Sequence, residues 1–320
     1  MLVGIVTRTL LSWVDEFERA CETLCLDYKL IDIDRADWSE QISGVDILLW
    51  RIHLGDKGGL EQACIKIPLM EQRGILCFPS SKMASFYENK IKQTFFFQQK
   101  GYLHPETLIS FSYQDAVDII ERVSYPIVCK TSGGASSSGV FLLNNQLEAH
   151  RVTKMIFEQL PLWKNRVFRL LKKAFGINCS IDCFKYIYLQ KMVSADNDWR
   201  ITTMGNGIVS VFKRYNRDND FRASGSGKWG KVTLTELPIE ACDIALKISE
   251  EESFSCMAYD FLISNGRNYL VEMSYTFLLN DVYVNTLFQK TENGYVELES
   301  IPVGVMHIQS LLTLKKIINE

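Results

Sequence analysis

The sequence predicts an α/β protein in which a small parallel-sheet domain precedes a larger, strand-rich part. In the first quarter of the chain, short apolar runs alternate with stretches whose apolar residues recur at helical spacing, as in strands joined by helical crossovers. After residue 186, apolar runs follow one another closely, which is typical of antiparallel strands. With 320 residues, 47% hydrophobic and 23% charged, the chain can form two or three globular units.

The N-terminal domain is expected to end near Pro79. Helical spacing in LLSWVDEFERACETLCL and across residues 58–73 predicts two helices. The alternation of strands and helices favours a parallel sheet covered by helices. Arg8, Arg51 and His53 fall at predicted strand ends, where they could hold anionic groups. Strands are predicted at residues 2–6, 28–33, 46–50 and 74–78.

The middle of the chain begins with a helix predicted from about Lys82 to Lys100. It should stop at Gly101, after which His104-Pro105 turns the chain into an extended segment. Further helices are expected near residues 113–123 and from about Gln146, and a polar, basic, Gly/Ser-rich loop over 216–231. The C-terminal HIQSLLTLKKIINE is amphipathic and could cover its own core or a neighbouring chain. Later strands are predicted at 186–193, 200–204, 207–213, 257–263 and 268–272.

Bulk composition limits the class of partner and compartment. The net charge of -3 gives no overall reason to expect nucleic acid or an anionic membrane surface as a partner. The N-terminus shows no basic leader, and no apolar run reaches the roughly 20 residues of a membrane span. The nine cysteines are scattered without metal-site spacing, which is typical of reduced, buried thiols. We therefore expect a cytoplasmic protein without a transmembrane segment.

The segment YPIVCKTSGGASSSGVFLL, residues 125–143, reads as two strands joined by a loop of small residues. Glycines allow backbone N–H groups to approach an anion, and Lys130 adds a point charge at the end of the first strand. An ordinary exposed hairpin turn explains the loop equally well when the segment is taken alone. It is not a Walker loop, because the lysine precedes the glycines.

A second hairpin, CMAYDFLISNGRNYLVEMSYT, places two carboxylates on neighbouring strands. Asn265-Gly266 is a strong turn signal, and antiparallel pairing about it brings Asp260 close to Glu272. Hard oxygen ligands suit Mg²⁺ that bridges nucleotide phosphates. The alternative is that one or both carboxylates face solvent on a half-exposed sheet.

Cations gather between these two hairpins. The segment from residue 189 to 227 places Asp198 among charged residues and glycines that could surround phosphates and a reactive anion. Ordinary surface charge is the alternative. The cations are Arg200, Lys213, Arg214, Arg217 and Arg222.

Taken in this order, the motifs from about residue 75 to 285 resemble the ATP-grasp superfamily. The similarity is strongest to the branch that contains the ribosomal-protein glutamate ligases, with glutathione synthetases and D-alanine–D-alanine ligases more distant. The resemblance implies an ATP-grasp fold: an N-terminal pre-ATP-grasp domain at 1–81, a small lid lobe at 82–189, and a large lobe with the metal site at 190–320. The two lobes would clamp the nucleotide.

The resemblance also implies roles for individual residues. Lys90 takes the place of the first nucleotide lysine, and Lys130 that of the second; they would contact the α- and β-phosphates. The flexible phosphate loop would include Gly134, Ser137 and Gly139. The adenine hinge would be formed by Gln190, Lys191, Met192 and Val193, followed by the Asp-x-Arg of Asp198, on the ribose side, and Arg200.

In the large lobe, Arg222 matches the arginine that would stabilise an acylphosphate and its tetrahedral intermediate, and Arg214 is a second phosphate clamp. Ala223 and Ser224 complete the Arg-Ser-Asn stretch of that branch. Asp260 and Glu272 match the metal carboxylates. Ser274 stands where the family has the Asn of Glu-x-Asn, so a hydroxyl replaces an amide as third metal ligand. Lys191 replaces the usual hinge Glu, and Asn89 the acidic residue before the first lysine.

The resemblance implies ATP-dependent ligation of a small-molecule or peptide carboxylate to an amine, forming an amide through an acylphosphate. ATP and one or two Mg²⁺ ions, with Mn²⁺ as a substitute, would be required. Two alternatives stay open: a kinase acting on a small hydroxyl compound, and a nucleotide-binding module with weak chemistry. A homo-oligomer also stays open.

A basic segment within residues 163–173 is interleaved with apolar residues. The favoured interpretation is an amphipathic helix that packs on its own domain. A docking surface for an anionic carrier, peptide or membrane face is the alternative hypothesis, which charge reversal at Lys172 and Lys173 would test.

Overall fold

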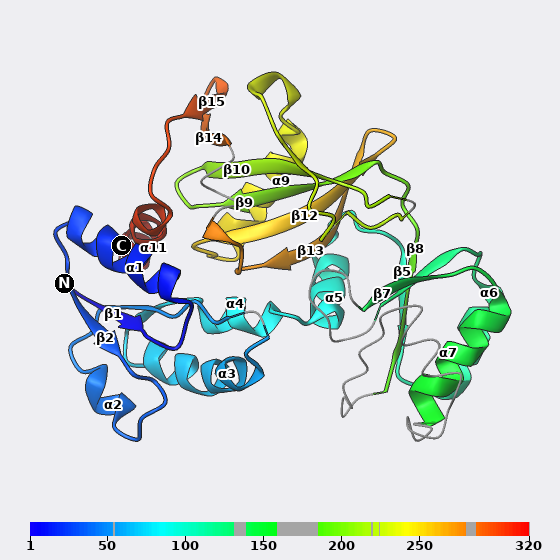
Figure 1. The fold of residues 1–320 in the computed structure, drawn as a ribbon, viewed down its shortest axis with the longest axis horizontal. Helices are drawn as coiled ribbons and strands as arrows, with labels where there is room; N and C mark the ends of the chain where they lie inside the picture. Colours follow the sequence, from blue (N-terminus) through cyan, green and yellow to red (C-terminus); the bar gives the residue numbers. More distant parts are fainter. Residues whose placement is uncertain are drawn as a thin grey trace.

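The computed structural model describes residues 1–53, 55–130, 139–158, 185–218, 220–223, 225–279 and 286–319. It contains three sheets, each with its own helices (Figure 1). Phosphate-loop residues Gly134 and Ser137, the basic segment 163–173, and Ser224 lie outside the described residues.

The N-terminal sheet is parallel, as predicted, with strand order β2-β1-β3-β4. Its buried strands are short and apolar, as expected for a sheet covered on both faces. Helices α1 and α3 occupy the predicted helical stretches, and a short helix, α2, was not predicted. The elements are β1 (Leu2–Val6), α1 (Leu11–Thr23), β2 (Asp27–Ile31), α2 (Trp38–Gln41), β3 (Ile47–Leu49), α3 (Lys57–Glu71) and β4 (Leu76–Phe78).

The prediction of a single helix from Lys82 to Lys100 is wrong, because the chain forms two helices, α4 (Ser81–Phe86) and α5 (Lys90–Lys100). Between them Glu88 has a φ of +54°, a left-handed conformation that interrupts the helix. Asn89 then restarts it, because its side chain accepts a hydrogen bond from the N–H of Lys92. The predicted stop at Gly101 is confirmed, with a φ of +72° at the cap.

The small antiparallel sheet has strand order β5-β8-β6-β7 and its own hydrophobic core beneath two helices. Both helices contact each other at the far end of the molecule in Figure 1. The elements are β5 (Thr107–Ser110), α6 (Tyr113–Arg122), β6 (Ile127–Lys130), β7 (Val140–Leu143), α7 (Gln146–Glu158) and β8 (Ile187–Lys191).

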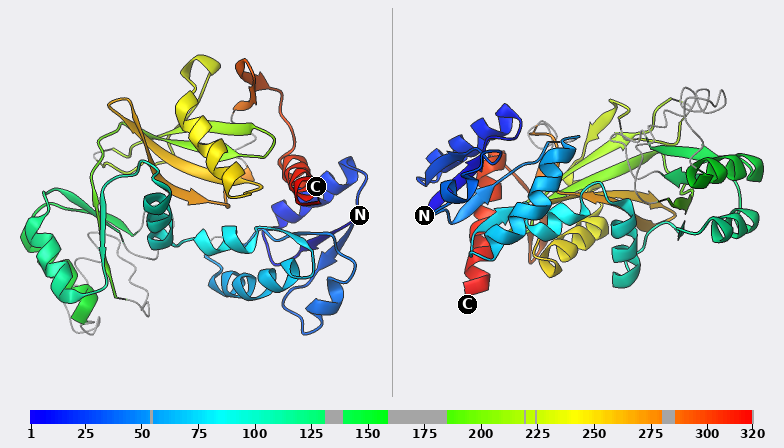
Figure 2. Two further views of the ribbon diagram at one scale, coloured as in Figure 1. Left: turned by 180° about the vertical axis from the view of Figure 1, so that it is seen from behind. Right: turned by 90° about the horizontal axis from the view of Figure 1, so that it is seen from below.

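The large sheet is antiparallel, with order β13-β12-β9-β10-β14-β15 and β11 attached to β10. Helix α9 (Ile239–Glu251) covers one face, which is turned toward the viewer in the left panel of Figure 2. The hairpin β14–β15 was not predicted. The strands are β9 (Asn197–Thr203), β10 (Ile208–Tyr215), β11 (Trp229–Lys231), β12 (Met257–Ser264), β13 (Arg267–Ser274), β14 (Thr286–Thr291) and β15 (Gly294–Leu298), with a 3-10 turn at Leu234–Glu236.

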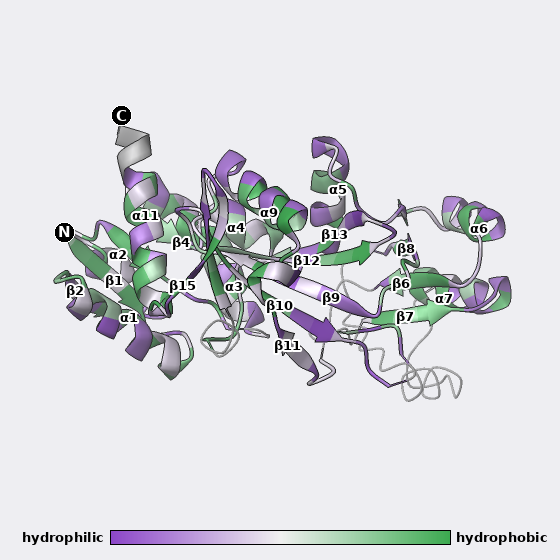
Figure 3. Ribbon diagram, turned by 90° about the horizontal axis from the view of Figure 1, so that it is seen from above, coloured by the Kyte–Doolittle hydropathy of each residue, from purple (hydrophilic) through white to green (hydrophobic). Residues whose placement is uncertain are grey.

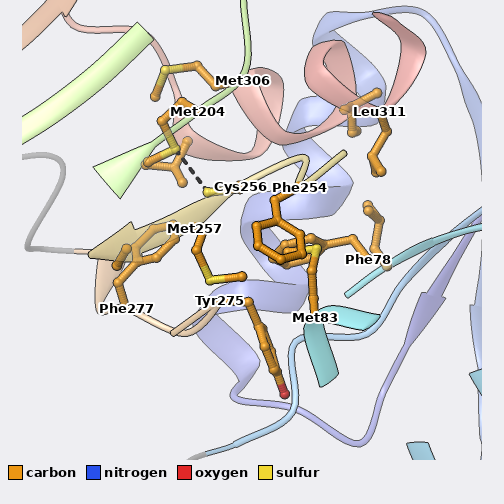
Figure 4. Packing of buried hydrophobic residues seen from close by; sticks show 14 of the residues in the cluster. Phe78, Met83, Met204, Phe254, Cys256, Met257, Tyr275, Phe277, Met306 and Leu311 are labelled. Carbon is orange, nitrogen blue, oxygen red and sulfur yellow. Dashed lines mark hydrogen bonds between the residues drawn. The ribbon is translucent and has the colours of Figure 1, made fainter. Parts of the chain in front are cut away.

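The C-terminal helix α11 (Val303–Asn319) returns to the N-terminal domain and packs against α1. Gly304 permits this approach, because a Cβ at that position would lie 2.7 Å from the backbone oxygen of Glu16. One continuous core joins the N-terminal domain, α11 and the large sheet, whereas the small sheet has a separate core. Figure 4 shows this junction, where Phe78, Tyr275, Phe277 and Met306 lie close together.

Candidate active site

The large sheet has one face packed against α9 and one polar face. Thr203 and Tyr259 point toward α9, where their hydroxyls lie 2.8 and 2.7 Å from that of Ser249. Side chains alternate along a strand, so Asp198 and Arg200 of β9 project from the opposite face. The register places Arg214 beside Asp198 and Asp260 beside Arg200 on that same face. Figure 3 shows hydrophilic colouring on β9 and toward the end of β10, in contrast to the hydrophobic β1.

Four of these residues form one ion-pair network on the polar face. Arg200 binds Asp260 through two N–H···O contacts of 2.8 and 2.9 Å, and Arg214 binds Asp198 through contacts of 2.6 and 2.8 Å. Arg214 Nη2 also lies 2.7 Å from Asp260 Oδ2, which joins the two pairs. All four side chains are largely buried. Two carboxylates and two guanidiniums therefore balance their charges in a site of low dielectric.

This network keeps Asp260 ionised. Burial by itself would raise the pKa of its carboxyl, but Arg200 and Arg214 hold that pKa well below its usual range. Asp198, predicted to reach the ribose, has both carboxylate oxygens bound to Arg214. A nucleotide that recruits Arg214 would therefore have to compete with both aspartates.

Glu272 lies directly opposite Asp260 on β13, as the hairpin prediction required. The turn is at Asn265 and Gly266, which both have positive φ, and the register shifts between Asp260 and Phe261. Glu272 is partly exposed and has no ion-pair partner in the described part of the chain. It is therefore available as an oxygen ligand.

Ser274, the residue in the place of the family asparagine, follows Glu272 on the same face of β13. Its hydroxyl lies 3.0 Å from that of Thr276 and accepts a hydrogen bond of 3.1 Å from the Thr276 N–H. This local turn already uses the hydroxyl. Across the described ranges, no three His, Cys, Asp or Glu side chains gather as a preformed metal site.

Lys130 ends β6 and is buried, with its ammonium 5.5 Å from the centre of the Tyr188 ring. Burial lowers its pKa to about 8, and the positive charge of Lys90 acts in the same direction, whereas Glu272 and Asp260 oppose it. These electrostatic couplings place both predicted nucleotide lysines and both predicted metal carboxylates in one neighbourhood. Residues from three parts of the chain thus meet at the site.

Helix α5 positions Lys90 within this neighbourhood. Gln93, one turn further along, is buried and binds both backbone groups of Met273, next to Glu272. The hydroxyl of Thr94 contacts that of Tyr188 in the small sheet at 2.8 Å. Helix α5 therefore connects β13, which carries Glu272, to β8, which pairs with the strand of Lys130. The sequence offered one signal for Gln93, a polar residue on the apolar side of a helix.

Glu88 is a site residue that the sequence analysis missed. It lies at the break between α4 and α5, is half-buried, and has no hydrogen bond or ion pair in the part of the chain that the structure describes. Burial raises the pKa of its carboxyl, and it lies within electrostatic range of Lys90, Glu272 and Lys57. Its positive φ marks local strain of the kind that functional sites hold. The sequence feature that could have identified Glu88 is its position two residues before Lys90.

The predicted adenine hinge connects the small sheet to the large one, because Lys191 ends β8 and Asn197 begins β9. Met192 and Val193 lie in this connection and are partly exposed. Gln190 is buried, and its amide donates to the Thr107 hydroxyl at 2.9 Å. Lys191 is exposed, 3.9 Å from Glu106.

Arg222 and Ala223 lie in the loop that follows β10. The guanidinium of Arg222 contacts Asp220 and donates to the backbone oxygen of Val140 at 3.0 Å. Val140 pairs with Lys130 and directly follows Gly139, so Arg222 reaches the base of the predicted phosphate loop. The loop after β10 and the two strands of the small-lobe hairpin therefore meet.

A model of the RimK-like ATP-grasp domain matches residues 87–282. The comparison with curated protein sequences gives no match. No helix of the described residues is long and apolar enough to cross a membrane.

Solved structures with the same fold extend over the whole chain. The RimK domain ATP-grasp protein of Sphaerobacter thermophilus has a TM-score of 0.63 at 12% identity, covering 98% of this chain and 100% of its own. A Chryseobacterium gregarium RiPP-associated ATP-grasp ligase, in complex with ADP and leader and core peptides, has a TM-score of 0.62 at 13% sequence identity. The match covers 96% of this chain and 96% of that ligase.

A biotin carboxylase domain of Hydrogenobacter thermophilus 2-oxoglutarate carboxylase, with Mg-ADP and bicarbonate, has a TM-score of 0.60 at 16% identity, covering 97% of this chain and 69% of its own. These likenesses support the ATP-grasp fold, and the domain match covers more than half of the chain. The protein is therefore a member of the RimK-like ATP-grasp family, a family of ATP-dependent ligases.

Proposed function

We propose that this protein joins a carboxylate to an amine through an acylphosphate, with ATP as the energy source. The observation that carries the proposal is the pairing of Asp260 with Glu272 on the polar face, within electrostatic range of Lys130. Carboxylates for a metal and a buried cation for phosphate are the two parts that phosphoryl transfer requires of a protein. The acid–amine specificity is inferred from the resemblance to peptide-forming members of the family.

The donor set fits Mg²⁺. Glu272 offers oxygens without a competing ion pair in the described part of the chain. Asp260 is ionised, but both of its oxygens contact arginines, so it would have to exchange one of these contacts for the ion. Glu272 and Asp260 would hold the ion, which would supply positive charge to neutralise the phosphates. Ser274 is a weak third candidate, because its hydroxyl is used by Thr276.

In the first step, a substrate carboxylate oxygen attacks the γ-phosphorus, the bond to the β–γ bridging oxygen breaks, and ADP leaves. Lys90 and Lys130 would hold the α- and β-phosphates, since Lys130 is within electrostatic range of Lys90 and of Glu272. Arg214 would serve as a second clamp after exchanging an aspartate oxygen for a phosphate oxygen. The protein's contribution is mainly position and charge.

In the second step, the amine nitrogen attacks the acyl carbon, inorganic phosphate leaves, and the amine gives up a proton. Arg222 would stabilise the oxyanion of the tetrahedral intermediate. Glu88 would attract the cationic amine and accept the proton whose loss makes the nitrogen nucleophilic, because it is a carboxylate without an ion pair among the described residues and its pKa is raised by burial; the proton lost when the amide forms leaves with the phosphate. The separate core of the small lobe lets it shift relative to the large sheet without breaking either core.

The test is release of ADP and phosphate from Mg-ATP across a panel of carboxylates, small and peptidic, each with and without amines. Release that needs both a carboxylate and an amine supports the ligase. Release with a hydroxyl compound alone would point to a kinase instead. Hydroxylamine added without the amine should trap the acylphosphate as a hydroxamate, and absence of that product during turnover would contradict the mechanism.

A nucleotide-binding module with weak chemistry is the second candidate, favoured by the local use of the Ser274 hydroxyl. Ser274→Asn separates the two. A large gain in ADP release with unchanged ATP affinity would show an impaired metal site in the natural protein, whereas no gain supports a site that works with serine.

A further inference from the structure

Two arginines follow strands of the parallel sheet, and they differ in their charge environment. Arg8, after β1, binds Asp56 through contacts of 2.7 and 2.8 Å and also contacts Asp34. Its charge is therefore neutralised within the N-terminal domain. Arg51, after β3, is only 3% exposed and has no carboxylate partner in the described part of the chain.

The surroundings of Arg51 satisfy its guanidinium only in part. It lies 5.3 Å from the centre of the Trp13 ring, and its Nη2 donates to the backbone oxygen of Phe277 at 2.8 Å. Its Nε is buried with no hydrogen-bond partner among the residues that the structure describes. A buried donor without an acceptor costs free energy that native proteins seldom leave uncompensated.

Two tyrosine hydroxyls beside Arg51 are also buried and, among the described residues, neither makes a hydrogen bond of standard geometry, although the Thr276 side chain lies near that of Tyr87. Tyr87 comes from the break between α4 and α5, and Tyr275 directly follows β13. Their ring centres are 5.0 Å apart, and the charge of Arg51 acts electrostatically on both hydroxyls. Figure 4 shows the Tyr275 side chain extending from the apolar cluster with its hydroxyl at the outer end. Three N–H or O–H donors from separate elements therefore gather at one junction.

This junction adjoins the catalytic strand. Tyr87 is within electrostatic range of Glu88 and Glu272, and Tyr275 is three residues after Glu272. It also lies beyond the carboxyl end of β3, and ligands of open parallel sheets bind outside such strand ends. A guanidinium and two hydroxyls are donors suited to a carboxylate, and the site carries an uncompensated positive charge.

We propose that Arg51, Tyr87 and Tyr275 bind a second carboxylate of the substrates, one that does not react. The proposal rests on the proposed ligase function and makes it more specific: one of the two joined molecules carries an additional carboxylate. Arg51 and Tyr275 are covered more completely than Tyr87, which is 6% exposed. We therefore expect the carboxylate to enter from the side of Tyr87, next to Glu272.

The experiment is calorimetric titration of the full chain with glutarate, with butyrate as the matched monocarboxylate and inorganic phosphate as a simple anion. The natural protein should bind glutarate at least about tenfold more tightly than butyrate or phosphate. Tyr87→Phe, Tyr275→Phe and Arg51→Met should each weaken glutarate binding at least about tenfold. Glutarate binding that is absent, no tighter than that of phosphate, or unchanged in these variants would overturn the proposal.

Thermal unfolding without ligand supplies an independent readout that also reveals a folding defect. The two Tyr→Phe variants remove unpartnered hydroxyls, so their Tm should be unchanged or higher. The control is Tyr125→Phe, which removes a hydroxyl that donates to Ile120 at 2.7 Å in the small lobe. It should lower Tm and leave glutarate binding unchanged. If Tyr87→Phe and Tyr275→Phe lower Tm as the control does, internal water satisfies these hydroxyls and the proposal is wrong.

The two proposals can fail separately, because glutarate binding is measured without turnover. Specific binding without amine-dependent ADP release would retain the carboxylate site and reject the ligase. Amine-dependent release without specific binding would retain the ligase and reject the site.

Discussion

The buried lysine at the end of β6 should make nucleotide binding strongly pH-dependent. Lys130 has a pKa lowered to about 8, chiefly by burial. At pH 7 about nine-tenths of the Lys130 ammonium is charged, and at pH 9 about one-tenth. If only the charged form binds phosphate, the Kd for Mg-ADP should rise about tenfold between these pH values, a loss of about 1.4 kcal/mol.

Isothermal titration calorimetry at pH 7, 8 and 9 would measure this effect. At pH 8, in buffers with different ionisation enthalpies, binding should take up about half a proton, because the phosphate restores the charge of Lys130. Lys130→Met is the control, since it removes the titrating group and should bind weakly at every pH. An equal Kd for the natural protein at pH 7 and 9, with no proton uptake, would refute the reasoning.

The same lowered pKa has a consequence for stability without nucleotide. Between pH 8 and the usual lysine value of 10.5, the unfolded chain binds more protons than the folded one. The contribution of Lys130 to the free energy of unfolding therefore increases as the pH rises through this window. Urea denaturation would measure the free energies of unfolding of the natural protein and of Lys130→Met. Their difference should change by up to roughly 3 kcal/mol across this pH window. A constant difference would contradict this linkage.

Four substitutions test other parts of the site and fold. Asp260→Asn leaves two buried guanidiniums short of negative charge, so it should lower the free energy of unfolding by about 3 kcal/mol in urea denaturation and abolish ADP release. The matched Glu272→Gln should also abolish ADP release but lower the free energy of unfolding by less than about 0.5 kcal/mol. Equal losses of stability in the two variants would refute this reasoning. Glu88→Gln should raise the KM for the amine about tenfold and leave that for ATP unchanged, whereas a rise for ATP alone would assign Glu88 to positioning Lys90. Gly101→Ala should lower stability by about 1 kcal/mol in urea denaturation because of the φ of +72°, and an unchanged midpoint would contradict that.

In the large sheet, sequence patterns predicted the hairpin that carries the two carboxylates. The turn at Asn265 and Gly266 predicts a hairpin that brings Asp260 close to Glu272, and a one-residue shift in the register between Asp260 and Phe261 then places the two carboxylates directly opposite each other. Short-range rules predict the hairpin because strand alternation and turn chemistry act within a few residues, but they do not predict the shift in register. The parallel N-terminal sheet was predicted for the same reason, from the alternation of apolar runs and helical stretches.

The ion-pair network could not be predicted, because its members come from three strands whose register depends on the whole sheet. Asp198, Arg200 and Arg214 were recognised as candidate residues, yet their pairing with Asp260 follows from the antiparallel order of β10, β9 and β12. The break before Lys90 was missed as well. The sequence has a continuous helical pattern there, but Asn89 caps a new helix, α5. The side chain of Gln93 also donates hydrogen bonds to the backbone oxygens of Phe86 and Met273, which stabilises the break.

The sequence by itself determined the local features: the N-terminal strands and helices, the lysine strand, the carboxylate hairpin and the resemblance to the family. Tertiary structure decided which charges remain free. Both Arg8 and Arg51 follow strands of the same sheet, but Asp34 and Asp56 neutralise the first, whereas the second lies under Trp13 with no carboxylate beside it in the described part of the chain. The availability of a charge depends on neighbours far away in the chain, which only the packing of the domains brings together.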